Sequence, residues 1–251
     1  MFGGTVPNLP KSDNLYSFGW GGAYEGDNSF DFMEIVNNAK DIPEVMEKME
    51  EASFSNGYRG MAVNLSLADT SGNIAYQLAV PMPKRKDLTP YLGCRVLDGR
   101  SSEFDWTDDL VPLDELPRSV NPARGYISNA NNRQAGDHAS YDFGATHMAT
   151  GRSIRIDELI REGIAQGKKF TPEDMVAFQQ DNMDVFARNM QPLVVKIAES
   201  MRSELKREDR EHLDKALSIY RDWDGSFEKD SIAASVHMHY NMAFYKSLFH
   251  K

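Results

Sequence analysis

The sequence predicts an α+β fold in which a β-rich portion precedes a mostly helical one. Apolar and polar residues alternate in two neighbouring segments between residues 61 and 80, and this period is typical of strands. After Gly151 the apolar residues recur at helical spacing, and this pattern continues to the end of the chain. We therefore expect a flexible lead-in over residues 1–14, a β-rich portion over 15–150 and a helical segment over 151–251.

Three elements are predicted before residue 55. Residues 15–22 carry three aromatic side chains at period two and end in a glycine pair, which predicts a strand. Residues 32–39 place apolar side chains at helical spacing. Asp41 then caps a second helix, and Pro43 falls in its first turn, where a proline is tolerated.

The next pattern predicts an antiparallel hairpin. Residues 61–67 and 74–80 both alternate, and residues 69–72 between them have the composition of a turn. From residue 81 to 122 the prolines, glycines and mixed charges show no period, so we expect a long ordered loop. A further strand is expected over residues 125–130.

Helices are predicted for the remainder of the chain. Ile156, Leu159 and Ile160 share one helix face, and the sequence Thr171-Pro172-Glu173-Asp174 supplies a cap, a first-turn proline and an N-terminal carboxylate. The charged run over residues 204–211 predicts a solvated face and a turn between helices.

The overall composition excludes some classes of partner. The net charge of −10 argues against binding to nucleic acid or to an anionic membrane surface, because both need clustered Lys and Arg. A single cysteine, Cys94, rules out an internal disulfide. No signal-like start and no apolar run of membrane-spanning length is present, so we expect no membrane partner.

Several familiar catalytic motifs are absent from the sequence. It contains no G-x-S-x-G, H-E-x-x-H or C-x-x-C pattern. His237 and His239 lie two residues apart on a predicted helix, where their side chains point in different directions and do not converge on one ion. We expect two partly buried helix histidines.

The strand expected at residues 125–130 runs into three asparagines: Asn129, Asn131 and Asn132. One interpretation is a turn, because asparagine tolerates left-handed backbone and bonds its own backbone. The other is a functional donor, because a side-chain amide is a neutral, directional donor suited to a developing oxyanion. Composition alone favours the turn.

A longer series of short motifs runs through most of the chain. It comprises Asn64, Ala68-Asp69, Gly72-Asn73-Ile74, Tyr76, Trp106, Pro112 to Pro117, Asn121-Pro122, Gly125-Tyr126-Ile127, Asn129, Asn131-Asn132, Arg152, Ile156 and Leu159. In order and spacing this series resembles the penicillin acylase family of N-terminal-nucleophile hydrolases, in the C-terminal part of the large catalytic chain. The resemblance implies part of a four-layer αββα sandwich followed by a helical segment.

The resemblance also implies roles for three residues. In that family an N-terminal Ser attacks an amide carbonyl with its own α-amino group as base. Asn131 matches the oxyanion-hole asparagine, and Arg152 matches the arginine that organises that asparagine and the nucleophile's surroundings. Asp142 matches a calcium-ligand aspartate, so a structural calcium ion is allowed although the chemistry requires no cofactor.

The resemblance implies a hydrolase of linear amides whose substrates are small acylated amines, such as penicillins or acyl-homoserine lactones. The family's nucleophile lies far upstream of Leu15, which only fourteen residues precede here. We therefore expect this chain alone to be inactive and to need a missing N-terminal half or small chain as its partner. The alternative is a non-catalytic remnant or binding subunit that keeps the scaffold.

Two further expectations follow from the resemblance. A partial sandwich leaves strand edges and apolar faces exposed, which predicts poor solubility or a partner chain. The family also favours a secreted, periplasmic or lumenal location, which the residues themselves do not address.

Overall fold

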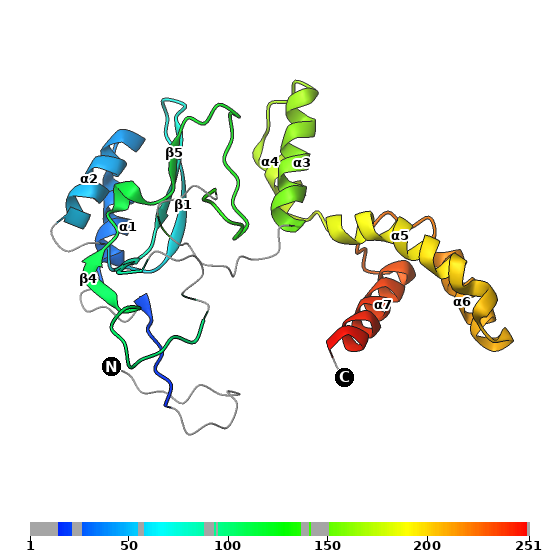
Figure 1. The fold of residues 1–251 in the computed structure, drawn as a ribbon. Helices are drawn as coiled ribbons and strands as arrows, with labels where there is room; N and C mark the ends of the chain where they lie inside the picture. The colour runs from blue at the N-terminus through cyan, green and yellow to red at the C-terminus, as the bar shows by residue number, and fades with distance from the viewer. Residues whose placement is uncertain are drawn as a thin grey trace. The chain divides into compact units, whose positions relative to one another are not determined.

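The computed structural model describes residues 15–21, 27–54, 58–87, 93, 95–136, 141 and 151–249. The chain forms two compact units (Figure 1), each described below by itself. The first comprises Met1–Asn129 and Arg133–Thr146, and the second comprises Ala130–Asn132 and His147–Lys251. The described residues combine helices with antiparallel sheet, so the predicted α+β class is confirmed.

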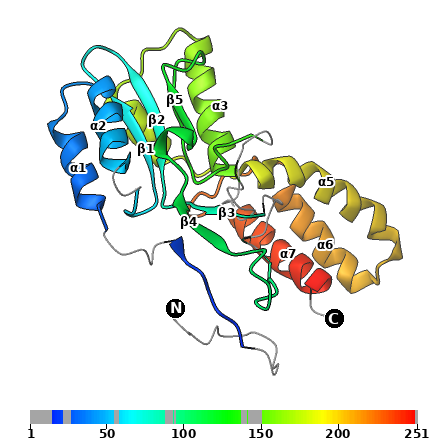
Figure 2. The same cartoon turned by 60° about the vertical axis from the view of Figure 1, so that its left-hand side comes forward.

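The described part of the first unit contains α1 (Ser29–Asn38), α2 (Ile42–Phe54), β1 (Val63–Ala68), β2 (Ile74–Ala79), β3 (Pro83–Arg85), β4 (Trp106–Leu110), the 3-10 helix η3 (Leu113–Glu115) and β5 (Arg118–Val120). One sheet has the antiparallel order β1-β2-β5, and a second sheet pairs β3 with β4. Helices α1 and α2 lie on one side of the three-stranded sheet in both views (Figures 1 and 2).

The core of the first unit lies between these two helices and the sheet. Phe32 of α1, together with Val45 and Met49 of α2, packs in one buried cluster with Ala79 of β2 and Leu116. Three apolar residues alternate along β1 and pack against this cluster from the sheet: Val63, Leu65 and Leu67. The period-two pattern of the sequence is therefore the pattern of the buried sheet face.

The predicted hairpin is confirmed, and Asp69 organises its turn. Oδ1 of Asp69 accepts from the backbone N–H groups of Ser71 and Asn73, both at 2.9 Å. Its Oδ2 accepts from the backbone N–H of Ile42 at 3.3 Å, which ties the turn to the start of α2. The predicted cap of that helix is also present, since Asp41 Oδ1 accepts from the backbone N–H of Glu44 at 2.9 Å.

The described part of the second unit is helical apart from its short connections. It contains α3 (Gly151–Ala165), α4 (Pro172–Gln179), α5 (Val185–Met201), the 3-10 helix η4 (Arg202–Glu204), α6 (Arg207–Tyr220) and α7 (Ile232–Phe249). Helix α5 contacts α3 and α6, and α6 also contacts α7 (Figure 2). None of the helices in the described ranges is both long and apolar enough to cross a membrane.

Two local signals in this unit are confirmed. Thr171 and Asp174 form the predicted capping box at the start of α4, where each side chain accepts from the other residue's backbone N–H. The charged run at 204–211 contains the connection between η4 and the start of α6. Its residues are mostly exposed, as expected for a solvated face.

Three strand and loop predictions are wrong. Residues 15–20 form no strand in the structure, and residues 125–130 are irregular instead of extended in a sheet. The expected loop over residues 81–122 contains β3, β4, η3 and β5. Strands exist only where another strand supplies hydrogen-bond partners, and β5 pairs with the residues of β2 more than forty positions earlier, at Gln77↔Arg118.

Candidate functional site

Residues Ala130–Asn132 form a tight turn that belongs to the second unit. Ala130 is buried, and its backbone N–H donates to Oδ1 of Asn132 at 3.1 Å. Asn131 has φ of 59°, in the left-handed region that asparagine adopts more readily than most residues. The turn chemistry expected of this asparagine cluster is therefore present at both positions.

Arg152, in the first turn of α3, holds this turn. Its Nη2 donates to the backbone carbonyl of Ala130 at 2.9 Å and to Oδ1 of Asn131 at 2.9 Å. A cation near a helix N-terminus is disfavoured by the helix dipole. The charge-assisted hydrogen bonds to the two oxygen acceptors offset the unfavourable interaction of this guanidinium with the helix dipole.

The contact with Arg152 determines which way the amide of Asn131 points. A guanidinium carries only donors, so the Asn131 atom that faces it must be the oxygen. The NH₂ group of Asn131 therefore lies at the other end of the amide plane, where it acts as a donor. A neutral donor whose oxygen is polarised by a cation is suited to stabilise negative charge that develops on a carbonyl oxygen.

The structure thus brings together two of the three residues singled out in the sequence, Asn131 and Arg152. Asp142, the predicted calcium ligand, lies outside the described residues. Within the described ranges, no group of three or more His, Cys, Asp or Glu side chains is arranged to hold a metal ion.

The two histidines of α7 differ in their exposure to solvent. His237 is buried, whereas His239 is exposed. Tyr220 Oη lies 2.7 Å from Nδ1 of His237, and Asn241 Nδ2 lies 2.9 Å from Nε2. His237 is therefore buried as expected, and the expectation that His239 is also partly buried is wrong.

Four charged residues that pair α3 with the start of α5 were not indicated by the sequence. Arg155 pairs with Asp181, and Arg188 pairs with Glu158. The partners are 26 and 30 residues apart along the chain. The spacing of Arg155 and Glu158 on one helix face is visible in the sequence, but nothing local indicates the distant partners.

Comparison with known proteins identifies the family to which the chain belongs. The sequence model of the penicillin amidase family matches residues 3–251, and the chain belongs to this family. Among solved structures it is similar to the thermostable penicillin G acylase from Alcaligenes faecalis, with 25% sequence identity and a TM-score of 0.52. The match covers 80% of this chain and 33% of the acylase chain, so the sequence spans about a third of that relative.

Proposed function

We propose that this chain supplies the oxyanion-stabilising part of a penicillin-acylase-like amide hydrolase. Asn131 donates its side-chain N–H to the carbonyl oxygen as negative charge develops, and Arg152 orients the amide. The observation that carries the proposal is the hydrogen bond from Arg152 Nη2 to Asn131 Oδ1 at 2.9 Å. Membership of the penicillin amidase family supports the assignment of an amidase-like reaction.

The rest of the mechanism follows the family. An N-terminal nucleophile, with its own α-amino group as base, attacks the carbonyl carbon of a small acylated amine; the C–N bond breaks, the amine leaves with a proton, and water hydrolyses the acyl-enzyme. This nucleophile comes from a part of the protein outside the present sequence, either an N-terminal half or a separate small chain. The sheet of the first unit forms part of an αββα sandwich with that missing portion. A structural calcium ion at Asp142 stays a prediction.

The first measurement is the intact mass and N-terminal sequence of the natural protein, followed by hydrolysis of chromogenic acyl anilides that include the phenylacetyl compound. A mature chain that begins upstream at Ser, Thr or Cys and turns over an anilide supports the proposal. A natural chain that begins at Met1 and is inert contradicts it. The protein would then be a non-catalytic remnant or binding subunit.

The decisive variant in the active natural protein is Asn131→Ala. Loss of one oxyanion donor lowers kcat by about 10²–10³-fold, while KM changes little because the interaction forms mainly in the transition state. Asn38→Ala is the matched control, since the side-chain amide of Asn38 donates to the carbonyl of Glu34 within its own helix. Equal kcat in the two variants would overturn the role of Asn131.

A further inference from the structure

Four charged side chains form a chain of paired hydrogen bonds that includes Arg155, which follows Arg152 by one turn of α3. Nε and Nη2 of Arg155 donate to the two carboxylate oxygens of Asp181 at 3.0 and 2.7 Å. Nη1 and Nη2 of Arg188 donate to the two oxygens of Glu158 at 3.0 and 2.6 Å. Nη1 of Arg155 also donates to Glu158 at 3.3 Å, which links the two pairs.

The Arg155–Asp181 pair is better shielded from water than the Arg202–Asp214 pair of the same unit. The side chains of Arg155 and Asp181 are each 19% exposed, against 46% and 44% for Arg202 and Asp214, which also form a two-bond pair. Bidentate, partly buried pairs of this kind are among the strongest charge-assisted hydrogen bonds. Hydrogen bonding from Arg155 holds the pKa of Asp181 below its ordinary value.

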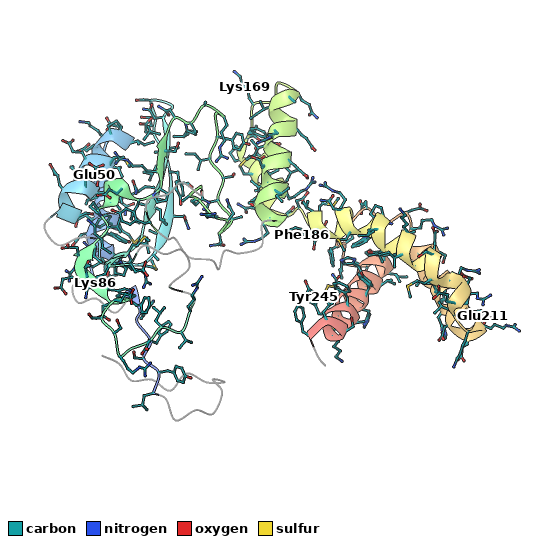
Figure 3. The ribbon with its side chains drawn as sticks, viewed as in Figure 1. Glu50, Lys86, Lys169, Phe186, Glu211 and Tyr245 are labelled. Carbon is teal, nitrogen blue, oxygen red and sulfur yellow. The ribbon has the colours of Figure 1, made fainter. Side chains whose placement is uncertain are left out.

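The four residues connect the first half of α3 to the start of α5. Arg155 and Glu158 belong to α3, Asp181 precedes α5 and Arg188 lies in its first turns. Figure 3 labels Phe186 where α5 begins beside the base of α3. A Cβ added at Gly151 would meet the Phe186 ring at 3.0 Å, so the two helix starts also touch through this ring.

The start of α5 is itself fixed from the other side. The backbone N–H of Asp184 donates to the carbonyl of Gly225 at 3.0 Å, and the N–H of Phe227 donates to the carbonyl of Asn182 at 3.0 Å. Gly225 has φ of 92°, and a Cβ there would lie 2.9 Å from the backbone N of Arg188. The helix start that holds α3 therefore has little freedom to move.

We propose that Arg155, Glu158, Asp181 and Arg188 form a clamp that positions Arg152, and through it the amide of Asn131. This inference rests on the proposed function of Asn131. Helix ends fray when nothing holds them, and Arg152 lies in the first turn of α3, one turn before Arg155. With the clamp intact, the guanidinium of Arg152 stays within reach of Ala130 and Asn131.

The clamp residues are positioning residues, so their test reads the amide itself. In the ¹⁵N-labelled chain, the side-chain NH₂ signals of Asn131 are assigned by their loss in Asn131→Asp. We expect Asp181→Asn, which removes the charge and keeps the size, to shift these signals and to accelerate their hydrogen exchange about tenfold. Arg155→Lys, which keeps the charge but loses the two-bond geometry, gives an intermediate effect.

Asp214→Asn is the matched control, because it breaks the two-bond pair with Arg202 in the same unit. It is expected to leave the Asn131 signals unchanged. Unchanged signals in a folded Asp181→Asn chain would overturn the clamp, and so would equal changes in Asp214→Asn. If Asp181→Asn fails to fold, Arg188→Lys applies the same test through Glu158.

The clamp and the proposed function fail separately. In the active natural protein, Asp181→Asn is expected to lower kcat about tenfold with little change in KM, because a misplaced donor weakens transition-state binding. If Asn131→Ala keeps full kcat while Asp181→Asn still shifts the Asn131 signals, the function is wrong and the clamp stands. If Asn131→Ala lowers kcat while Asp181→Asn leaves the Asn131 signals unchanged, the proposed function stands and the clamp is wrong.

Discussion

Asn131 combines two properties that the sequence presented as alternatives. Its backbone occupies the left-handed region, with φ of 59°, as expected of a turn asparagine. Its side chain meanwhile accepts from Arg152, as expected of an oriented donor. The two interpretations are compatible because backbone conformation and side-chain amide are separate groups. The backbone conformation sets the direction of the side chain, and the hydrogen bond from Arg152 fixes the orientation of its amide group.

His237 is the residue whose burial makes the second unit sensitive to pH. It is only 3% exposed and lies among aromatic rings, with the Trp223 ring centroid 5.0 Å from its own. Burial lowers the pKa of His237, and the negative charge of Asp184 opposes this only in part. The imidazole is therefore held neutral in the folded chain at neutral pH.

The free energy of unfolding should fall as the pH drops below about 6.5, the ordinary pKa of histidine. The unfolded chain takes up a proton at His237 there, whereas the folded chain takes it up only at lower pH. Urea unfolding between pH 5 and 7.5, followed by circular dichroism, measures this. His237→Gln removes that part of the slope and His239→Gln, at an exposed position, keeps it. The same slope in both variants would contradict the assignment.

At the scale of elements, the sequence predicted what local chemistry determines. The cap at Asp41, the hairpin turn at Asp69 and the capping box at Thr171 each depend on groups only a few residues apart. The strand β5 depends instead on the free edge of β2, and its residues Arg118–Val120 carry no apolar alternation. Residues 15–20 show the converse case, because alternation without a strand partner forms no strand.

The candidate site also contains residues that the sequence predicted and residues that it did not. The roles of Asn131 and Arg152 were predicted from a family resemblance, which can relate residues that are distant in sequence. These two residues are 21 positions apart and share a hydrogen bond. The resemblance did not indicate the ion pairs that α3 makes with Asp181 and Arg188. Periodicity did not indicate them either, because it does not predict which charged residues of two helices pair with each other. A pattern of helical spacing locates a helix face, and only the packed structure gives its partner.

The helices α5 and α6 begin differently, and we predict opposite changes in the free energy of unfolding when their N-cap residues are substituted. Oδ1 of Asp184 caps α5 by accepting from the N–H groups of Phe186 and Ala187 at 2.8 and 3.1 Å, whereas Lys206 begins α6 with no side-chain cap. We expect Asp184→Ala to lower the free energy of unfolding by about 1 kcal/mol and Lys206→Ser to raise it by a comparable amount.

Urea unfolding of the full chain checks both cap variants. Asp184→Asn is the control, because asparagine caps about as well as aspartate. If Asp184→Ala and Asp184→Asn are equally stable, the cap contributes nothing. If Lys206→Ser leaves the unfolding midpoint unchanged, the start of α6 is satisfied in another way.

At the scale of the whole molecule, the second unit carries an apolar stripe along α5. Its members recur every three or four residues and are each 39–49% exposed: Phe186, Met190, Leu193, Ile197 and Met201. Helices of soluble proteins normally bury such a stripe. The chain spans about a third of the solved acylase chain that it matches, and an uncovered stripe agrees with the expectation of poor solubility or a partner chain.

We therefore expect the chain by itself to self-associate as its concentration rises, since water is expelled when two apolar stripes meet. Sedimentation velocity over a range of concentrations measures this. The double variant Leu193→Glu and Ile197→Glu places two charges within the stripe and should keep the chain monomeric. Val96→Glu is the control, because Val96 is 74% exposed in a loop of the first unit and is not part of the stripe. Association that persists in the double variant would mean that another surface holds the copies together.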